Sequence, residues 1–328
     1  SLLDLVDGVF NLYGSGSLAG GIHIRVAGGL QFLDGEYDLS ETSRVYGGGD
    51  IAIVNDIVDA DGFFNLTGGQ FELKDGQLHL LTDAVVHNSK SPLQVNCGRL
   101  EFGTAGSGGH THPVQDGKVV IDRVQMSCQQ AVVDQPVEIL ESLDQDGGQL
   151  IVTSSLSIFN YTLTGGTVTG VAADIVVLNH FLWSDFGTFD YTGNVVENVL
   201  ETKDSARIEG TPPPAPPASI MRNSAYTMVF NGTTVWEDGS VACTQDCKII
   251  NEGVFTVLGN TVLDRQLTTP GAFINNDYML VDVGAANKLI VQTPFFNSAS
   301  GHLEVVTGTL ELQNTCNFDG VITVHAGA

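Results

Sequence analysis

Hydrophobic and polar residues alternate with a period of two along most of the chain. Clear examples lie at 22–26, 71–73, 78–80, 303–305 and 310–312. Such alternation turns one set of side chains inward and the other toward solvent, as in half-buried β-strands. The runs are short and bounded by Gly, Asn, Asp or Ser, which favour tight turns. The pattern therefore predicts an all-β chain.

A second pattern repeats at longer range: a Phe or Ile residue followed by Asn. From Asn231 onward the steps between these Asn residues are 20, 24 and 22 residues. A period of 20–25 residues with Asn at a corner fits one coil of a β-solenoid, where Asn side chains stack and hydrogen-bond to neighbouring backbone. The alternative is that Asn and Gly mark the hairpin turns of tandem β-sandwiches. The full set of these positions is Asn11, Asn65, Asn160, Asn231, Asn251, Asn275 and Asn297.

Two further similarities between distant sequence segments favour the solenoid. Leu-Trp-Ser-Asp at 182–185 returns as Val-Trp-Glu-Asp at 235–238, and the last stretch, 308–328, resembles the first, 8–29. We predict a right-handed parallel β-helix of roughly 13–16 coils. Because a solenoid leaves an open coil at each end, the likeness of the two ends predicts end-to-end continuation with like copies, either as one module of a longer array or as separate copies that stack into a filament.

The expected organisation has three parts. Solenoid coils occupy 1–103 and 150–328, and an irregular insertion or loop region occupies 104–149. Within 121–146, Pro136 and a poorly kept 3.6-residue period argue against a helix and favour loop or strand. A Pro-rich excursion at 211–219 must leave the sheet, because proline cannot donate ladder hydrogen bonds.

Three segments carry a resemblance to a known family. Segments 183–188, 273–277 and 304–312 resemble the Trp-Ser-Gly, Phe-Asn-Asn and Ser-Gly-Thr-Leu steps of secreted β-strand-repeat proteins, adhesin-like surface proteins with parallel β-helix stalks. The resemblance implies an extracellular or cell-surface location and a structural or adhesive role. It transfers no catalytic residue.

Charge narrows the range of partners. The 328 residues include 38 acidic and 13 basic side chains, a formal net charge of −25. Nucleic acids and anionic membrane surfaces need clustered Lys and Arg, which are scattered singly here. No apolar run reaches the roughly 18 residues of a membrane helix, so we expect no membrane insertion.

Hard oxygen ligands gather beside Gly turns in two places. Ca²⁺ takes six to eight such oxygens, so these residues are candidate structural Ca²⁺ ligands, although the full twelve-residue loop pattern is absent and plain acidic turns are the alternative. They are Asp56, Asp59, Asp61, Asp144 and Asp146. His110 and His112 could both face a zinc or copper ion, but no third ligand is evident nearby, and a surface loop is the alternative.

The sequence gives little support to an enzymatic function. Parallel β-helices host pectin-cleaving enzymes, but here Gly109-His110 is followed by Thr111 and Arg207-Ile208 by Glu209, unlike the steps those hydrolases use. We expect no enzyme and no cofactor beyond the candidate Ca²⁺. The alternative is a carbohydrate-binding adhesin or a polysaccharide-active enzyme, which outward-facing aromatic side chains would favour. The aromatic residues that discriminate are Trp183, Tyr191, Trp236 and Tyr278.

Cysteines and sequons suggest covalent chemistry at the surface. Cys243 and Cys247 can close a short disulfide loop, Cys97 and Cys128 can link neighbouring coils, and Cys316 can pair with another subunit or stay as a buried thiol. Sequons at Asn65, Asn160 and Asn231 are candidate glycan sites that also coincide with the Asn corners. The Pro-rich excursion is either a rigid loop or, if its prolines are hydroxylated, a glycosylated spur. Its candidate positions are Thr211, Pro212, Pro213, Pro214, Pro216 and Pro217.

Overall fold

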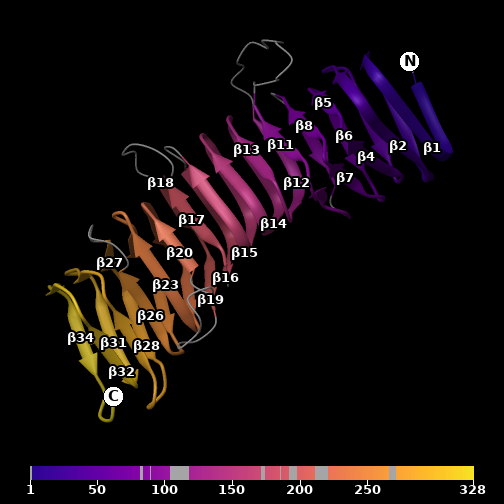
Figure 1. Cartoon of the computed structure of the whole chain (residues 1–328). Coiled ribbons are helices and arrows are strands. Elements are labelled where there is room, and N and C mark those ends of the chain that lie inside the picture. The colour runs from indigo at the N-terminus through magenta and orange to yellow at the C-terminus, as the bar shows by residue number, and fades with distance from the viewer. Residues whose placement is uncertain are drawn as a thin grey trace. The chain divides into compact units, whose positions relative to one another are not determined.

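The computed structural model describes residues 2–81, 84–88, 90–103, 118–170, 174–184, 186–191, 198–210, 221–265 and 271–328. These residues form β-strands, turns and irregular backbone without a helix, and the chain divides into two compact units, Ser1–Phe159 and Asn160–Ala328. Figure 1 shows the strands of each unit stacked side by side in chain order. The all-β prediction is confirmed.

The strands of the first unit begin with two that each run through a whole coil. They are β1 (Leu2–Leu18), β2 (Gly21–Leu39), β3 (Arg44–Gly47), β4 (Asp50–Val54), β5 (Ile57–Ala60), β6 (Phe63–Leu66), β7 (Phe71–Lys74), β8 (Gln77–Leu80), β9 (Val85–His87), β10 (Leu93–Val95), β11 (Arg99–Phe102), β12 (Val119–Met126), β13 (Gln130–Val133) and β14 (Val137–Val152). β15 (Ser155–Gly170) contains the boundary between the units.

The strands of the second unit are mostly short. They are β16 (Asp174–Ser184), β17 (Thr188–Tyr191), β18 (Asn198–Thr202), β19 (Ser205–Glu209), β20 (Met221–Ser224), β21 (Tyr226–Phe230), β22 (Thr233–Trp236), β23 (Gly239–Thr244), β24 (Lys248–Asn251), β25 (Val254–Val257), β26 (Thr261–Arg265), β27 (Ala272–Asn275), β28 (Tyr278–Asp282), β29 (Lys288–Val291), β30 (Phe295–Asn297), β31 (His302–Thr307), β32 (Thr309–Leu312), β33 (Cys316–Phe318) and β34 (Val321–Val324).

Strand pairing identifies the solenoid. In the second unit each strand from β17 to β31 pairs in parallel with the strand three places further along, as β24 does with β27 and β27 with β30. One coil therefore contributes three strands, and neighbouring coils stack strand on strand. Parallel pairing between consecutive coils excludes the sandwich alternative, whose neighbouring strands are joined by hairpins and run antiparallel. The chain winds through about 13 turns, at the lower end of the expected range.

The region expected to be irregular is partly regular. Residues 104–117 lie outside the described residues, but 118–149 form β12, β13 and most of β14, which pair in parallel with one another. A register shift between Ile121 and Arg123 interrupts the period of two within β12. Because of this irregularity, the hydrophobic pattern of the sequence does not predict a strand that otherwise alternates.

The core of each unit is a stack of apolar side chains on the inner faces of the strands. Phe255, Phe273 and Phe295 follow one another on successive coils, with ring centroids 5.4 and 5.6 Å apart. Trp183 and Trp236 are also fully buried, and each indole N–H donates to a backbone carbonyl, of Gly187 and Asp238 respectively. Both indoles are thus satisfied within the core.

A ladder of Asn side chains runs beside the Phe stack. Asn251, Asn275 and Asn297 are in register on β24, β27 and β30 and are almost completely buried. The amide of Asn251 donates to Asn275 Oδ1 at 2.7 Å, and the amide of Asn275 donates to Asn297 Oδ1 at the same distance. Asn297 Nδ2 donates onward to the Val321 carbonyl at 3.2 Å. The predicted Asn stacking with bonds to backbone therefore exists on these three coils.

Candidate functional site

The first coil leaves much of its apolar surface uncovered. Among the described strands β1 pairs only with β2, so one face of the coil has no neighbour. Leu2, Val9 and Tyr13 are 63%, 59% and 67% exposed. Val6 and Phe10, also on β1, are exposed as well. This face would bury a row of apolar side chains if another coil stacked on it.

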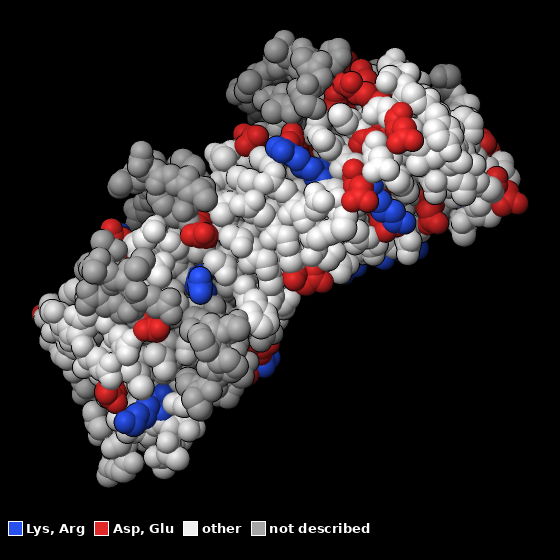
Figure 2. All heavy atoms as spheres, in the orientation of Figure 1, with Lys and Arg blue, Asp and Glu red and all other residues white. Residues whose placement is uncertain are grey.

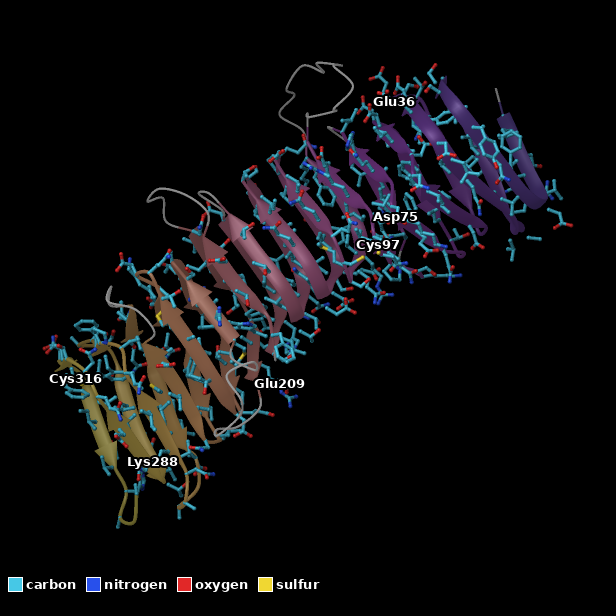
Figure 3. All side chains as sticks on the ribbon, viewed as in Figure 1. Glu36, Asp75, Cys97, Glu209, Lys288 and Cys316 are labelled. Atoms are coloured by element: carbon cyan, nitrogen blue, oxygen red, sulfur yellow. A yellow bond between two sulfur atoms is a disulfide. The ribbon has the colours of Figure 1, made fainter. Side chains whose placement is uncertain are left out.

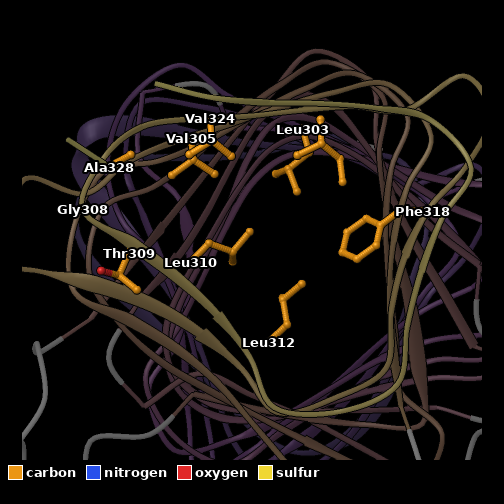
Figure 4. Close-up of a pocket in the computed structure, with 10 residues that line it drawn as sticks. Leu303, Val305, Gly308, Thr309, Leu310, Leu312, Phe318, Val324 and Ala328 are labelled. Carbon is orange, nitrogen blue, oxygen red and sulfur yellow. The ribbon is translucent and has the colours of Figure 1, made fainter. Parts of the chain in front are cut away.

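The last coil, at the C-terminal end of the second unit, also has one uncovered face. Its strands β32, β33 and β34 pair with β29, β30 and β31 and with no later described strand. Figure 4 looks into this end and shows Leu303, Leu310, Leu312 and Phe318 pointing into the interior. They line a hollow of about 250 Å³ with apolar walls. Here the hydrophobic core itself reaches the surface.

Exposed large apolar residues concentrate on these two end coils. β1 holds five of them and β33–β34 hold four, together nine of the 17 in the described residues. The four on the last coil are Phe318, Val321, Ile322 and Val324. Exposed apolar surfaces of this kind are typical of faces that another coil or another molecule covers.

Two glycines that align in the similar first and last sequence segments also have similar backbone angles. Gly8 and Gly308 have φ of +78° and +83°. A residue with a Cβ atom rarely adopts this left-handed backbone conformation, so both positions favour glycine for the same reason. The two aligned glycines thus share a left-handed backbone conformation.

A buried row of ionisable side chains lies on the first unit and was not predicted. Asp59, His79 and Glu101 are in register on β5, β8 and β11, and they alternate with core residues. His79 Nδ1 lies 2.6 Å from Asp59 Oδ1, and its Nε2 lies 3.5 Å from Glu101 Oε2. The His79 side chain is 1% exposed. The Nδ1 contact links β8 to β5, whereas Nε2 faces Glu101 on β11 without a hydrogen bond among the described residues.

The candidate Ca²⁺ ligands do not form one site in the described residues. Asp56 Oδ1 accepts the Ile57 amide at 2.7 Å, and burial raises the pKa of the Asp56 carboxyl. Asp59 is held by His79, and Asp61 is half-buried just after β5. Asp144 accepts the Ser142 hydroxyl at 3.2 Å, and Asp146 is exposed. No group of three or more His, Cys, Asp or Glu side chains in the described ranges is arranged around a metal position. Ca²⁺ binding stays a prediction.

The cysteines take three different states. Cys243 and Cys247 form a disulfide across their short loop, with Cα atoms 5.7 Å apart. Cys97 and Cys128 are free thiols side by side on neighbouring coils. Cys316 is a half-buried free thiol on β33 of the open last coil, and burial raises its pKa.

The candidate glycan sites differ in accessibility. Asn65 is exposed, whereas Asn160 accepts a hydrogen bond from Asn179 at 2.7 Å. Asn231 donates to Glu201 Oε1 at 2.7 Å. Asn65 therefore has the most open side chain of the three. The candidates His110 and His112, and the Pro-rich positions from Thr211 to Pro217, lie outside the described residues.

Most of the aromatic residues whose exposure would favour sugar binding are buried or hydrogen-bonded. Trp183 and Trp236 are in the core, and Tyr278 is half-buried with its hydroxyl donating to Glu304. The side chain of Tyr191 lies outside the described residues. Neither indole is available for stacking on a sugar.

The charged surface offers no basic patch in the described part. Figure 2 shows Lys and Arg singly among Asp and Glu on the visible face. Many of these cations are paired with carboxylates, as Arg25 is with Asp4 and Lys288 with Glu311. No described helix is long and apolar enough to cross a membrane.

Fold and pairing place the chain in the class of parallel β-solenoid repeat proteins. Comparison with protein-family models, curated proteins and solved structures finds no match. The resemblance to β-strand-repeat surface proteins therefore rests on the sequence steps and on the repeat architecture.

Proposed function

We propose that the protein is a structural module of an extracellular or cell-surface filament, appendage or stalk, and that its end coils associate with like copies. The single observation that carries the proposal is the concentration of exposed apolar side chains on the two end coils. Stacking a second solenoid on such a coil buries these side chains and pairs the backbone N–H and C=O groups of the open strands.

The interior of the fold supports a mechanical role. Inward positions carry apolar residues stacked from coil to coil, and the polar ladders at Asn275 and His79 link successive coils through side chains. A carbohydrate-binding adhesin or a polysaccharide-active enzyme remains the second candidate. Two buried indoles weigh against sugar stacking, so the structural module is preferred. The proposal assigns no catalytic residue and allows glycans on exposed sites such as Asn65.

The test is self-association as a function of protein concentration. We expect sedimentation velocity to show species that grow with concentration, and electron microscopy of the concentrated sample to show linear end-to-end chains. Ile322→Asp places a charge on the apolar wall of the open last coil, where Ile322 is 43% exposed. It should reduce association at least tenfold, since burying an unpaired carboxylate is costly.

The matched control is Val254→Asp. Val254 is 42% exposed but lies on β25, which has a paired strand on both sides. It should associate like the unmodified protein, and circular dichroism should show that both variants keep the β fold. A protein that stays monomeric at every concentration, or two variants with equal association, would refute the proposal.

A further inference from the structure

Cys97 and Cys128 occupy equivalent positions on two neighbouring coils of the first unit. Cys97 lies in the turn between β10 and β11, and Cys128 in the turn between β12 and β13. The two turns are in register, because Val95 pairs with Met126 before them and Arg99 pairs with Gln130 after them. The cysteines therefore stack directly on one another.

The two sulfur atoms are already close. Their Sγ atoms lie 2.7 Å apart, nearer than two unbonded sulfur atoms normally approach. Beside them the Ser127 hydroxyl donates to Asn96 Oδ1 at 3.3 Å, which is a second link between the same two turns. Bond formation thus requires little movement of the backbone.

The two thiols differ in access. Cys97, which Figure 3 labels, is exposed, whereas Cys128 is half-buried. Burial, followed by the neighbouring Cys97 and the carboxylates of Asp75 and Asp146, raises the pKa of the Cys128 thiol to about 11. An oxidant from solvent therefore meets Cys97 first, while Cys128 remains protonated at neutral pH.

We propose that Cys97 and Cys128 are a redox-controlled staple, a dithiol that a small-molecule disulfide such as oxidised glutathione converts into an inter-coil disulfide. The Cys97 thiolate attacks one sulfur of oxidised glutathione, which forms a mixed disulfide and releases one glutathione. Cys128 then loses its proton, and its sulfur attacks Cys97 Sγ and displaces the second glutathione. Two thiols lose two electrons, one oxidised glutathione gains them, and the two protons end on the two glutathione products.

The staple acts on the fold by closing a loop. The two cysteines are 31 positions apart, and the closed segment contains all of β11 and β12. Constraining a loop of this length lowers the entropy of the unfolded chain. Oxidation should therefore raise the melting temperature by about 5–10 °C, and reduction should reverse the gain. This inference is independent of the proposed end-to-end association.

The experiment uses the full chain with Cys316→Ser, so that the third free thiol does not contribute. The protein is incubated with oxidised glutathione, the remaining thiols are alkylated, and peptides are mapped by mass spectrometry. We expect one crosslinked peptide pair joining Cys97 to Cys128, with a mass lower by two hydrogen atoms. The Cys243–Cys247 peptide serves as the internal disulfide standard.

Single variants separate the two roles. Cys128→Ser should accumulate a stable glutathione adduct on Cys97, because no second thiol displaces it. Cys97→Ser should form an adduct on Cys128 at least about tenfold more slowly, since that thiol is half-buried and oxidised glutathione reaches it less easily. Neither variant should gain the higher melting temperature on incubation with oxidised glutathione. Separate glutathione adducts on both cysteines of the otherwise unmodified chain, without a crosslinked pair, would overturn the proposal, and so would a crosslink that leaves the melting temperature unchanged.

Discussion

At the scale of single residues, Asp56 shows how burial changes the chemistry of an acidic turn. Its Oδ1 accepts the Ile57 amide, while its buried Oδ2 has no hydrogen-bond partner in the described residues. Desolvation raises the pKa of this carboxyl, and the nearby negative charges of Asp34 and Glu36 add to the effect. Ionised Asp56 is therefore less favourable in the folded chain than in the unfolded one.

This shift gives a prediction with a definite sign. A carboxyl whose folded pKa is raised stabilises the fold below its usual pKa of 3.8, and that stability is lost as pH rises through the folded value. Asp56→Asn removes the loss, so the variant should gain stability relative to the unmodified chain between pH 3 and pH 7. Urea denaturation across this pH range measures the difference. Asp38→Asn, which changes an exposed carboxylate, controls for the loss of one negative charge.

The unmodified chain and Asp56→Asn also test the hypothesis that Asp56 binds Ca²⁺. If Asp56 bound Ca²⁺, the ion would stabilise the unmodified chain, and Asp56→Asn would lose that gain. Equal pH profiles for the variant and the unmodified chain would contradict the assignment of a costly buried charge.

The burial of His79 could not be predicted from the pattern of its own strand. Alternation correctly placed Leu78 and Leu80 inward, but it assigned His79 to solvent, where its exposed fraction is in fact 1%. Its partners Asp59 and Glu101 lie 20 and 22 positions away. Only the coil period reveals that these three side chains stack, and the irregular spacing in the first half of the chain concealed that period.

At the scale of elements, the Asn ladder carries the most specific cross-coil contacts. Asn275 is the middle rung and bonds both Asn251 and Asn297. Asn275→Ala leaves a buried amide on one side and a buried carbonyl on the other without this partner. Each such group costs about 1–3 kcal/mol, so the free energy of unfolding should fall by at least about 2 kcal/mol.

The neighbouring residue provides the control for this prediction. Asn276 donates to Glu252 Oε1 on the outer surface, and Asn276→Ala should change stability by no more than about 0.5 kcal/mol. Because solenoid coils contact only their neighbours, amide hydrogen exchange in Asn275→Ala should accelerate in β24, β27 and β30 and leave the first unit unchanged. Uniform acceleration along the chain would contradict a nearest-neighbour solenoid.

Sequence patterns predicted the short strands better than the long ones. From Asn231 onward, turns with Gly or Asn separate strands of regular spacing, and the predicted coils exist. In β1, β2 and β14 the strand continues through the corners of a coil, with register shifts such as that between Tyr13 and Gly14. Such shifts break the period of two within one continuous strand, and the shift in β12 explains why 118–149 was expected to be irregular.

At the scale of the whole molecule, charge and apolar surface are distributed differently. The net charge of −25 comes from side chains spread along the coils, while nine of the 17 exposed large apolar side chains in the described part of the chain lie on the two end coils. Like charges therefore repel two approaching copies, and the apolar end coils attract them. The ends could be recognised from the similarity of the first and last sequence segments, but their exposure could not, since alternation does not say which coil lacks a neighbour.

This opposition predicts how association responds to salt. Raising the ionic strength from about 0.02 to 0.5 M shortens the Debye length several-fold, which screens the repulsion between copies and leaves the apolar attraction intact. End-to-end association, measured by sedimentation velocity at fixed protein concentration, should therefore strengthen with salt. Ile322→Asp should stay weakly associated at every salt concentration, because screening does not remove the cost of burying its carboxylate. Association that weakens as salt rises would mean that ion pairs rather than apolar coil faces join the copies, and the end coils would then not be the adhesive surface.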